Sequence, residues 1–214
     1  MKNIDIESWK RKEHYVFYSG FDDPFFNIVV NIDCTQAFKY VKENNHSFFA
    51  FYLYCSSLAI DNIMELKHRI LDDKVVEYDN IHIASTIGRD DGSFAFSFVN
   101  FNKSFLDFNA ELQYEILNVQ NSKGLRLNED DKRLDVIHYS TMPWNSFTGL
   151  NHPRSFNNND SVPKIVFGKA EFINGKRMMP VSLSAHHGLV DGIHAAQYFS
   201  KFEQILKSNS DIND

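Results

Sequence analysis

Hydrophobic and polar positions follow different periods along the chain, and each period predicts a different kind of element. From residue 93 to residue 101 they alternate (SFAFSFVNF), which is typical of a strand with Phe94, Phe96 and Phe98 on one face. We expect that face to pack in the core, with the lining of a pocket as the alternative. Residues 25–32 (FFNIVVNI) are rich in β-branched and aromatic side chains, so they predict a second strand.

Five further segments are predicted to be helical from capping residues and from apolar positions three or four apart. They are residues 8–17, a segment that Thr35 begins, residues 47–68, residues 104–119, and a C-terminal segment with Ile193, Ala196, Phe199, Phe202 and Leu206 on one face. Ser8 and Ser104 are cap residue types, and Gly20 is a stop signal for the first helix. The segment over 47–68 is apolar nearly all round, which indicates a buried helix.

Two strands near the C-terminus are predicted to form a hairpin. Residues 164–172 and 177–187 have strand composition, and Asn174-Gly175 between them readily takes the two positive φ values of a tight turn. The other segments are a predicted strand at 135–141 and polar loops at 121–133 and 157–160. Strands mixed with helices indicate one α/β domain over residues 1–214, a two-layer sandwich with a mixed β-sheet covered by helices.

Composition and charge narrow the possible partners. The formal charge is −6 at pH 7, so the chain offers no attraction to nucleic acid or to an anionic membrane. The N-terminus lacks the apolar segment of a signal peptide, and no stretch reaches the ~18 apolar residues of a spanning helix. These features favour the cytoplasm. Cys34 and Cys55 have no CxxC or His-rich neighbourhood, so we expect buried thiols and no metal site.

The clearest candidate chemistry lies in residues 186–192 (HHGLVDG), at the end of an apolar strand and before a helix. A histidine with a pKa near neutrality can take a proton from a hydroxyl or thiol and later return it. The alternative is a strand end and turn whose polar groups are simply satisfied by their neighbours. Adjacent strand residues point to opposite faces, so His186 and His187 are poorly placed to bind one metal ion together.

Three motifs resemble those of the chloramphenicol acetyltransferase family. HHGLVDG is similar to its HHxxxDG signature, which is shared more loosely with dihydrolipoyl acyltransferases and peptide-synthetase condensation domains. Residues 9–15 (WKRKEHY) are similar to the family's N-terminal W-x-R-K-E-H-F element, and residues 143–148 (PWNSFT) are similar to its P-W-x-S-F-T segment. The order and spacing of the three motifs agree over nearly the whole chain, which favours the chloramphenicol branch.

The resemblance implies a reaction, partners and roles for single residues. It implies a homotrimer with active sites between subunits, acetyl-CoA as co-substrate with no permanently bound cofactor, and a small hydroxylated acceptor. Chloramphenicol is the first candidate, with antibiotic resistance as the associated role. His187 matches the general base, while Asp191 and Arg11 match an ion pair that holds the loop of that base. Tyr18 matches an acceptor-pocket tyrosine, with plain core packing as the alternative.

The sequence departs from the family pattern at two positions. In the family a serine follows the P-W-x-S-F-T segment, and its hydroxyl helps to stabilise the oxyanion of the reaction intermediate, but Gly149 stands at that place. A family threonine that helps to hold an active-site water corresponds to Val166. Two alternatives therefore stay open: the same chemistry on a different small alcohol or amine, and a catalytically silent homologue that binds CoA or an apolar ligand.

Overall fold

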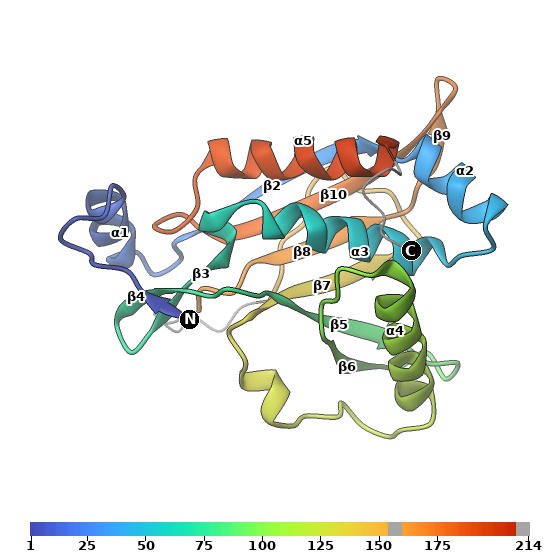
Figure 1. Cartoon of the computed structure of the whole chain (residues 1–214), viewed down its shortest axis with the longest axis horizontal. Coiled ribbons are helices and arrows are strands. Elements are labelled where there is room, and N and C mark those ends of the chain that lie inside the picture. The colour runs from blue at the N-terminus through green and yellow to red at the C-terminus, as the bar shows by residue number, and fades with distance from the viewer. Residues whose placement is uncertain (154–159, 209–214) are drawn as a thin grey trace.

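The computed structural model of the protein describes residues 1–153 and 160–208 and arranges them around a β-sheet (Figure 1). The strands are β1 (Lys2–Asn3), β2 (Phe25–Asp33), β3 (His68–Leu71), β4 (Lys74–Glu77), β5 (His82–Gly88), β6 (Phe94–Val99), β7 (Val136–Met142), β8 (Lys164–Gly168), β9 (Glu171–Ile173) and β10 (Lys176–His186). The helices are α1 (Lys12–Ser19), α2 (Thr35–Glu43), α3 (Phe48–Asp61), α4 (Phe105–Gln120) and α5 (Gly192–Ser208), with short 3-10 helices η1 (Met64–Lys67) and η2 (Glu129–Lys132).

The larger sheet has seven strands and is mixed. Six of them follow the order β2-β10-β8-β7-β5-β6, and β9 pairs with β10. The pairs β5–β7 and β7–β8 are parallel, whereas β2–β10, β10–β8 and β5–β6 are antiparallel. The mixed sheet with its helices confirms the predicted α/β class. Strands β1, β4 and β3 form a second, three-stranded sheet.

Helices α3 and α5 lie side by side over one face of the larger sheet (Figure 1). The buried Ser56 hydroxyl of α3 is hydrogen-bonded to the Tyr139 hydroxyl of β7 at 3.2 Å and to the Tyr198 hydroxyl of α5 at 2.8 Å. Phe167 of β8 stacks on Tyr139 with 5.9 Å between the ring centroids. The main core therefore lies between the sheet and these helices, and it holds the central strands in place.

The first helix begins later than predicted. α1 covers Lys12–Ser19 instead of residues 8–17, because the Ser8 hydroxyl donates to the Asp5 carboxylate at 2.8 Å and does not cap a helix. Gly20 follows the last helical residue, as predicted. The first three residues of the WKRKEHY motif therefore precede the helix.

The buried helix predicted over residues 47–68 is shorter in the structure. The hydroxyl of Ser47 caps the first turn of α3, as its residue type favours, but the helix ends at Asp61. The Asn62 side-chain amide then donates to the Leu58 carbonyl at 2.8 Å and closes the last turn. The η1 turn and the β3–β4 hairpin follow, and strands of four residues carry too little pattern to be predicted from a single sequence.

The aromatic stripe of β6 faces away from the core, so the prediction that it packs there is wrong. Phe94 and Phe96 are 48% and 37% exposed, whereas Ala95, Ser97 and Val99 are buried. The small side chains allow α4 to pack closely against β6. The strand register then places the phenylalanines on the sheet face opposite to the helices.

The C-terminal hairpin turns at Asn174 and Gly175 as predicted, with φ angles of 50° and 80°. Its first arm is interrupted, because β8 ends at Gly168 and β9 begins after a short break. The second arm is β10, which ends at His186. His187, the last residue of the predicted strand, is therefore the first residue beyond the observed one.

The C-terminal helix is present, and its buried face includes Phe199, Phe202 and Leu206 as predicted, but not the two residues predicted at its start. Ile193 is 63% exposed and Ala196 is also exposed. The buried residues of α5 are Ala195, Tyr198, Phe199, Phe202, Ile205 and Leu206. Tyr198 is buried although it is polar, because Ser56 satisfies its hydroxyl. The apolar pattern therefore locates most of the buried face of this helix but misplaces its first residues.

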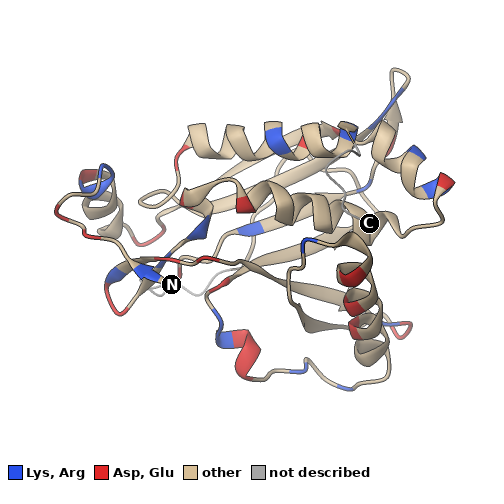
Figure 2. Ribbon diagram, in the orientation of Figure 1, with Lys and Arg blue, Asp and Glu red and all other residues tan. Residues whose placement is uncertain are grey.

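Lys and Arg residues are interspersed with Asp and Glu residues along the ribbon (Figure 2). Cys34 and Cys55 are buried free thiols, as predicted, and burial raises the pKa of Cys34 to about 12. None of the helices in residues 1–153 and 160–208 is long and apolar enough to cross a membrane. The loop predicted at 157–160 lies outside the described residues, apart from Asp160.

Candidate active site

His187 follows directly after β10, a strand that is paired on both sides. The antiparallel register with β2 runs up to the pair His186–Phe25, at the end of the strand. Beyond it, the His187 N–H donates to the Pro24 carbonyl at 2.8 Å. These bonds fix the backbone from which the imidazole extends.

Two aromatic rings pack against the His187 imidazole. Tyr18, from the last turn of α1, stacks on it with 4.3 Å between centroids and 4° between ring planes. Phe26 of β2 packs at 4.7 Å with a tilt of 48°. The Nδ1 atom is buried and has no hydrogen-bond partner among the described residues. The ring is thus clamped by its faces, and Nε2 is the nitrogen left to accept a proton from a bound molecule.

Arg11 ties together the two ends of the loop that carries His187. Its Nη2 donates to the His187 carbonyl at 2.9 Å, and its Nη1 lies 3.5 Å from Oδ2 of Asp191. The other Asp191 oxygen accepts the Gly192 N–H at 2.6 Å, at the start of α5. The backbone hydrogen bond from Gly192, followed by the charge of Arg11, holds the pKa of Asp191 below its ordinary value. The carboxylate is therefore ionised at neutral pH, and its support is lost as pH falls through the lowered pKa.

The double variant of Arg11 and Asp191 is expected to lose less activity than the sum of the two single variants. Arg11→Ala and Asp191→Ala should each lower kcat, because each frees the loop behind His187, but both remove one ion pair. We expect a coupling free energy of about 1 kcal/mol from a double-mutant cycle in kcat. Lys10→Ala changes a neighbouring exposed charge and should leave kcat unchanged. Strict additivity would show that the two side chains act independently.

His186 points to the opposite side of the strand and shapes the turn. It is 2% exposed, and its Nδ1 accepts the Gly188 N–H at 3.1 Å. A Cβ on Gly188 would lie 3.0 Å from the His186 ring and 3.2 Å from the Tyr15 backbone, so the turn requires glycine. Within the described ranges, no group of three or more His, Cys, Asp or Glu side chains is arranged to hold a metal ion.

The segment that contains Gly149 crosses the end of β8. Phe147 packs against Gly168, where a Cβ would lie 2.8 Å from the phenyl ring. The Asn145 carbonyl accepts the Lys169 N–H at 3.0 Å. A Cβ built on Gly149 itself would meet no atom within 4 Å. The segment is therefore anchored before Gly149, and the glycine faces open space.

The structure separates the predicted site residues into two groups. Three of them surround His187, as described above. In the part of the chain that the structure describes, no hydrogen bond or ring contact joins His187 to Gly149 or to Val166. Val166 is buried in β8, opposite Ser182 of β10.

Sequence analysis missed two contacts of His187. The sequence predicts only a strand at Phe26 and no role for Pro24, although both hold the imidazole or its backbone. The signal that would reveal them is the register in which the start of β2 meets the end of β10. Because that register joins segments far apart in sequence, the hydrophobic pattern of a single chain does not contain it.

The fold is that of known acyltransferases. A solved chloramphenicol acetyltransferase superposes with a TM-score of 0.91 at 30% sequence identity, covering 97% of this chain and 100% of the other. A probable dihydrolipoamide acetyltransferase from Listeria monocytogenes shares the fold, with a TM-score of 0.67 at 16% identity, covering 97% of this chain and 94% of the other. The fold and the histidine at the end of β10 define a CoA-dependent acyltransferase.

Sequence comparison defines the branch. The chloramphenicol acetyltransferase family model matches residues 1–203, and the chain belongs to that family. A chloramphenicol acetyltransferase from Proteus mirabilis is 25% identical, over 94% of this chain and 92% of that protein. Another chloramphenicol acetyltransferase, from Clostridium butyricum, is 27% identical, over 96% of this chain and 94% of that protein. The family uses acetyl-CoA as its co-substrate.

Proposed function

We propose that this protein is an O-acetyltransferase that moves the acetyl group of acetyl-CoA to a hydroxyl of a small acceptor, with chloramphenicol the first candidate. One observation carries the proposal: the His187 imidazole is clamped between Tyr18 and Phe26 and presents Nε2 as its accessible nitrogen. A fixed imidazole with one free nitrogen is suited to general-base catalysis. In this reading the Tyr18 ring also borders the space that the acceptor occupies.

Nε2 of His187 takes the proton of the acceptor hydroxyl as the hydroxyl oxygen attacks the carbonyl carbon of the thioester. A C–O bond forms, and the π electrons of the carbonyl move onto its oxygen to give a tetrahedral oxyanion. When the C=O bond forms again, the C–S bond breaks and the sulfur of CoA leaves with the bonding electrons. The sulfur then takes the proton from His187. The products are an acetyl ester and the free thiol of CoA, and the imidazole is neutral again.

The surroundings of His187 favour this proton transfer. The imidazole becomes positively charged when it holds the acceptor proton, and Asp191 is the ionised carboxylate that interacts with this charge. Arg11 forms an ion pair with Asp191 and donates a hydrogen bond to the His187 carbonyl, so its positive charge is partly balanced. Tyr18 and Phe26 pack against the ring and hold it in one orientation while Nε2 accepts the proton.

A homotrimer with active sites between subunits is part of the proposal. Its support is the sheet face that the helices leave uncovered, where Phe94 and Phe96 of β6 are exposed. Exposed aromatic side chains grouped on one face are typical of surfaces that bind another protein. A second copy of this chain fits best, because the family resemblance places the site between subunits.

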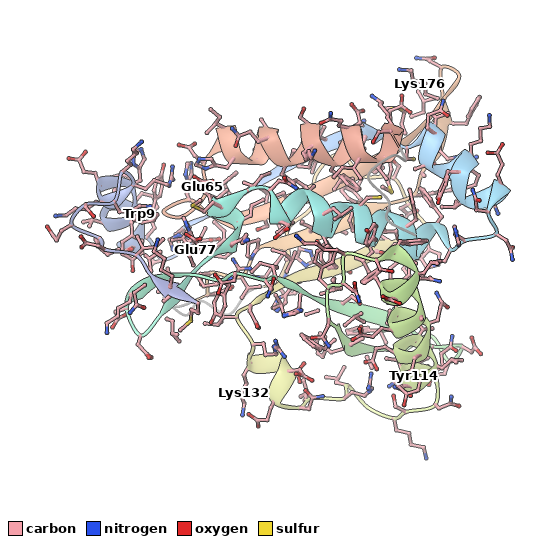
Figure 3. The ribbon with its side chains drawn as sticks, viewed as in Figure 1. Trp9, Glu65, Glu77, Tyr114, Lys132 and Lys176 are labelled. Atoms are coloured by element: carbon pink, nitrogen blue, oxygen red, sulfur yellow. The ribbon has the colours of Figure 1, made fainter. Side chains whose placement is uncertain are left out.

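Light scattering is expected to give a mass about three times the 24.9 kDa of the chain. The double variant Phe94→Glu with Phe96→Glu should weaken assembly and lower activity together, because buried charges oppose association. Tyr114→Glu changes an exposed aromatic residue of α4, on the helical side of the sheet, and is the matched control (Figure 3). A stable parental monomer at micromolar concentration would rule out a site that needs two subunits.

Gly149 and Val166 favour a second candidate within the same chemistry. Both lack the hydroxyl that the family pattern has at these positions, so an acceptor other than chloramphenicol, a small alcohol or an amine, is the alternative. A silent homologue that binds CoA without turnover is the third possibility. Release of the CoA thiol with a panel of acceptors separates the three. A role in antibiotic resistance requires chloramphenicol turnover, and a cytoplasmic location is proposed from the sequence alone.

A further inference from the structure

His194 connects the loop of the active site to a distant part of the chain. It lies in the first turn of α5, three residues after Asp191, and its Nδ1 accepts the Asp191 N–H at 3.0 Å. Its Nε2 lies 3.5 Å from Oε1 of Glu65, and its side chain is 14% exposed. Figure 3 labels Glu65 on the segment after α3, on the side of the molecule where α5 begins. One imidazole therefore bridges η1 and the Asp191 loop.

These contacts fix the tautomer of His194. An Nδ1 that accepts a hydrogen bond carries no proton, so the proton of the neutral ring is on Nε2, which faces the Glu65 carboxylate. The backbone completes a reciprocal pair, since the His194 N–H donates to the Asp191 carbonyl at 3.0 Å. Protonation of Nδ1 would place an N–H against the Asp191 N–H and break the side-chain bond.

The hydrogen bond between His194 and Asp191 is linked to His187 through Arg11. His194 holds the backbone of Asp191, the Asp191 carboxylate meets Arg11, and Arg11 donates to the His187 carbonyl. We propose that His194 is a positioning residue that holds the His187 loop while its ring is neutral and releases it when the ring takes a second proton. This inference rests on the proposed role of His187 as the base.

Three charged groups face the His194 ring. Glu65 faces it from η1, Arg11 from the segment before α1, and Asp191 from its own loop. Burial lowers the pKa of His194, Arg11 lowers it further, and the two carboxylates raise it, with a net lowering. The ring is therefore neutral at neutral pH. Because the folded-state pKa is depressed, the support that His194 gives is complete above its ordinary pKa and is lost as pH falls through the depressed value.

A plain helix cap is the competing role, because the reciprocal pair resembles a capping box, in which the third helical residue accepts the cap N–H. Two variants separate the roles. His194→Ala removes the hydrogen-bond acceptor. His194→Gln keeps an acceptor of the type favoured at the third helical position, but its side chain does not titrate in the pH range of a histidine. A cap alone predicts that Gln restores activity without changing the pH profile. A titrating positioning residue predicts that Gln restores activity and also changes the profile.

The test measures kcat against pH together with hydrogen–deuterium exchange of the Asp191 amide at fixed pH. We expect His194→Ala to lower kcat roughly tenfold with little change in the KM for acetyl-CoA, and to speed exchange at Asp191. His194→Gln should bring both kcat and the exchange rate at Asp191 back to the parental values. The acid limb of the parent should steepen below the pKa of His194, and that of His194→Gln should not. Glu65→Gln should move the steepening to lower pH, because it removes a charge that raises this pKa.

The outcomes also separate this inference from the proposed function. Parental kcat, pH profile and exchange in His194→Ala would overturn the positioning role, and an unchanged acid limb in His194→Gln would reduce it to a cap. If the parent shows no turnover with any acceptor, the proposed function fails, and the exchange measurement still decides whether His194 holds the loop. Unchanged exchange at Asp191 in His194→Ala would then overturn the inference as well.

Discussion

His187→Ala is expected to lower kcat for acetyl transfer by about 10²–10⁴, because the variant has no group to take the acceptor proton. The loss should appear in kcat more than in KM, since the imidazole acts on the reacting hydroxyl in the transition state. Release of the CoA thiol at saturating acetyl-CoA and acceptor measures it. Light scattering should show the same assembly as the parent, which would assign the loss to the missing imidazole.

His186→Ala is the matched control for this loss. His186 is a buried neighbour of the same chemical type, and its Nδ1 holds the Gly188 N–H. Its removal should lower the melting temperature and disturb the turn, so any loss of activity should follow the loss of folded protein. If His187→Ala instead turned over as fast as the parent, His187 would not be the base, and the mechanism would have to be abandoned.

Gly149→Ser is expected to raise kcat with chloramphenicol by up to about 10²–10³. A hydroxyl directed at the developing oxyanion stabilises the transition state more than the ground state, and one such donor is typically worth ~2.7–4 kcal/mol. The parent should accordingly be slow with chloramphenicol. The substitution should fold, because a Cβ at Gly149 meets no atom within 4 Å. KM should change little, and steady-state kinetics on the purified variant measures both constants.

Gly149→Ala is the control that separates the hydroxyl from the added carbon. It should leave kcat near the parental value, because it fills the same space without a donor. Fast parental turnover of chloramphenicol would contradict the prediction and would indicate a substitute donor, for which Ser146 and Thr148 of the same segment are the candidates. Unchanged or lower activity in Gly149→Ser would show that the room left by glycine serves a different acceptor.

The strands and helices with a strong local signal could be predicted from the sequence. Asn174-Gly175 predicted its hairpin because the two positive φ angles are a property of those residues. The face of β6 could not be predicted, because alternation shows that two faces differ but not which one a helix covers. Small residues on one face of β6 allow α4 to approach. Which face the helix covers depends on contacts distant in sequence. Ser8 failed as a cap for a local reason, since the Asp5 carboxylate three residues earlier accepts its hydroxyl.

The candidate site divides in the same way. The motif resemblance singled out His187, Arg11 and Asp191, and the structure places these three side by side. Phe26 and His194 were not predicted, because their roles come from the meeting of β2 with β10 and from a tautomer fixed by Glu65. Such roles are set by geometry between separate segments, and residue type and spacing carry no record of them.

Thiol release from acetyl-CoA across a panel of small alcohols and amines that includes chloramphenicol is the most direct test of the proposed function. We expect release of the CoA thiol that requires both acetyl-CoA and a hydroxylated acceptor, an acetylated acceptor identified by mass spectrometry, and loss of both in His187→Ala. The contradictory result is parental protein that binds acetyl-CoA but releases no thiol above background with any acceptor. That outcome would identify the chain as a CoA-binding homologue without transferase activity.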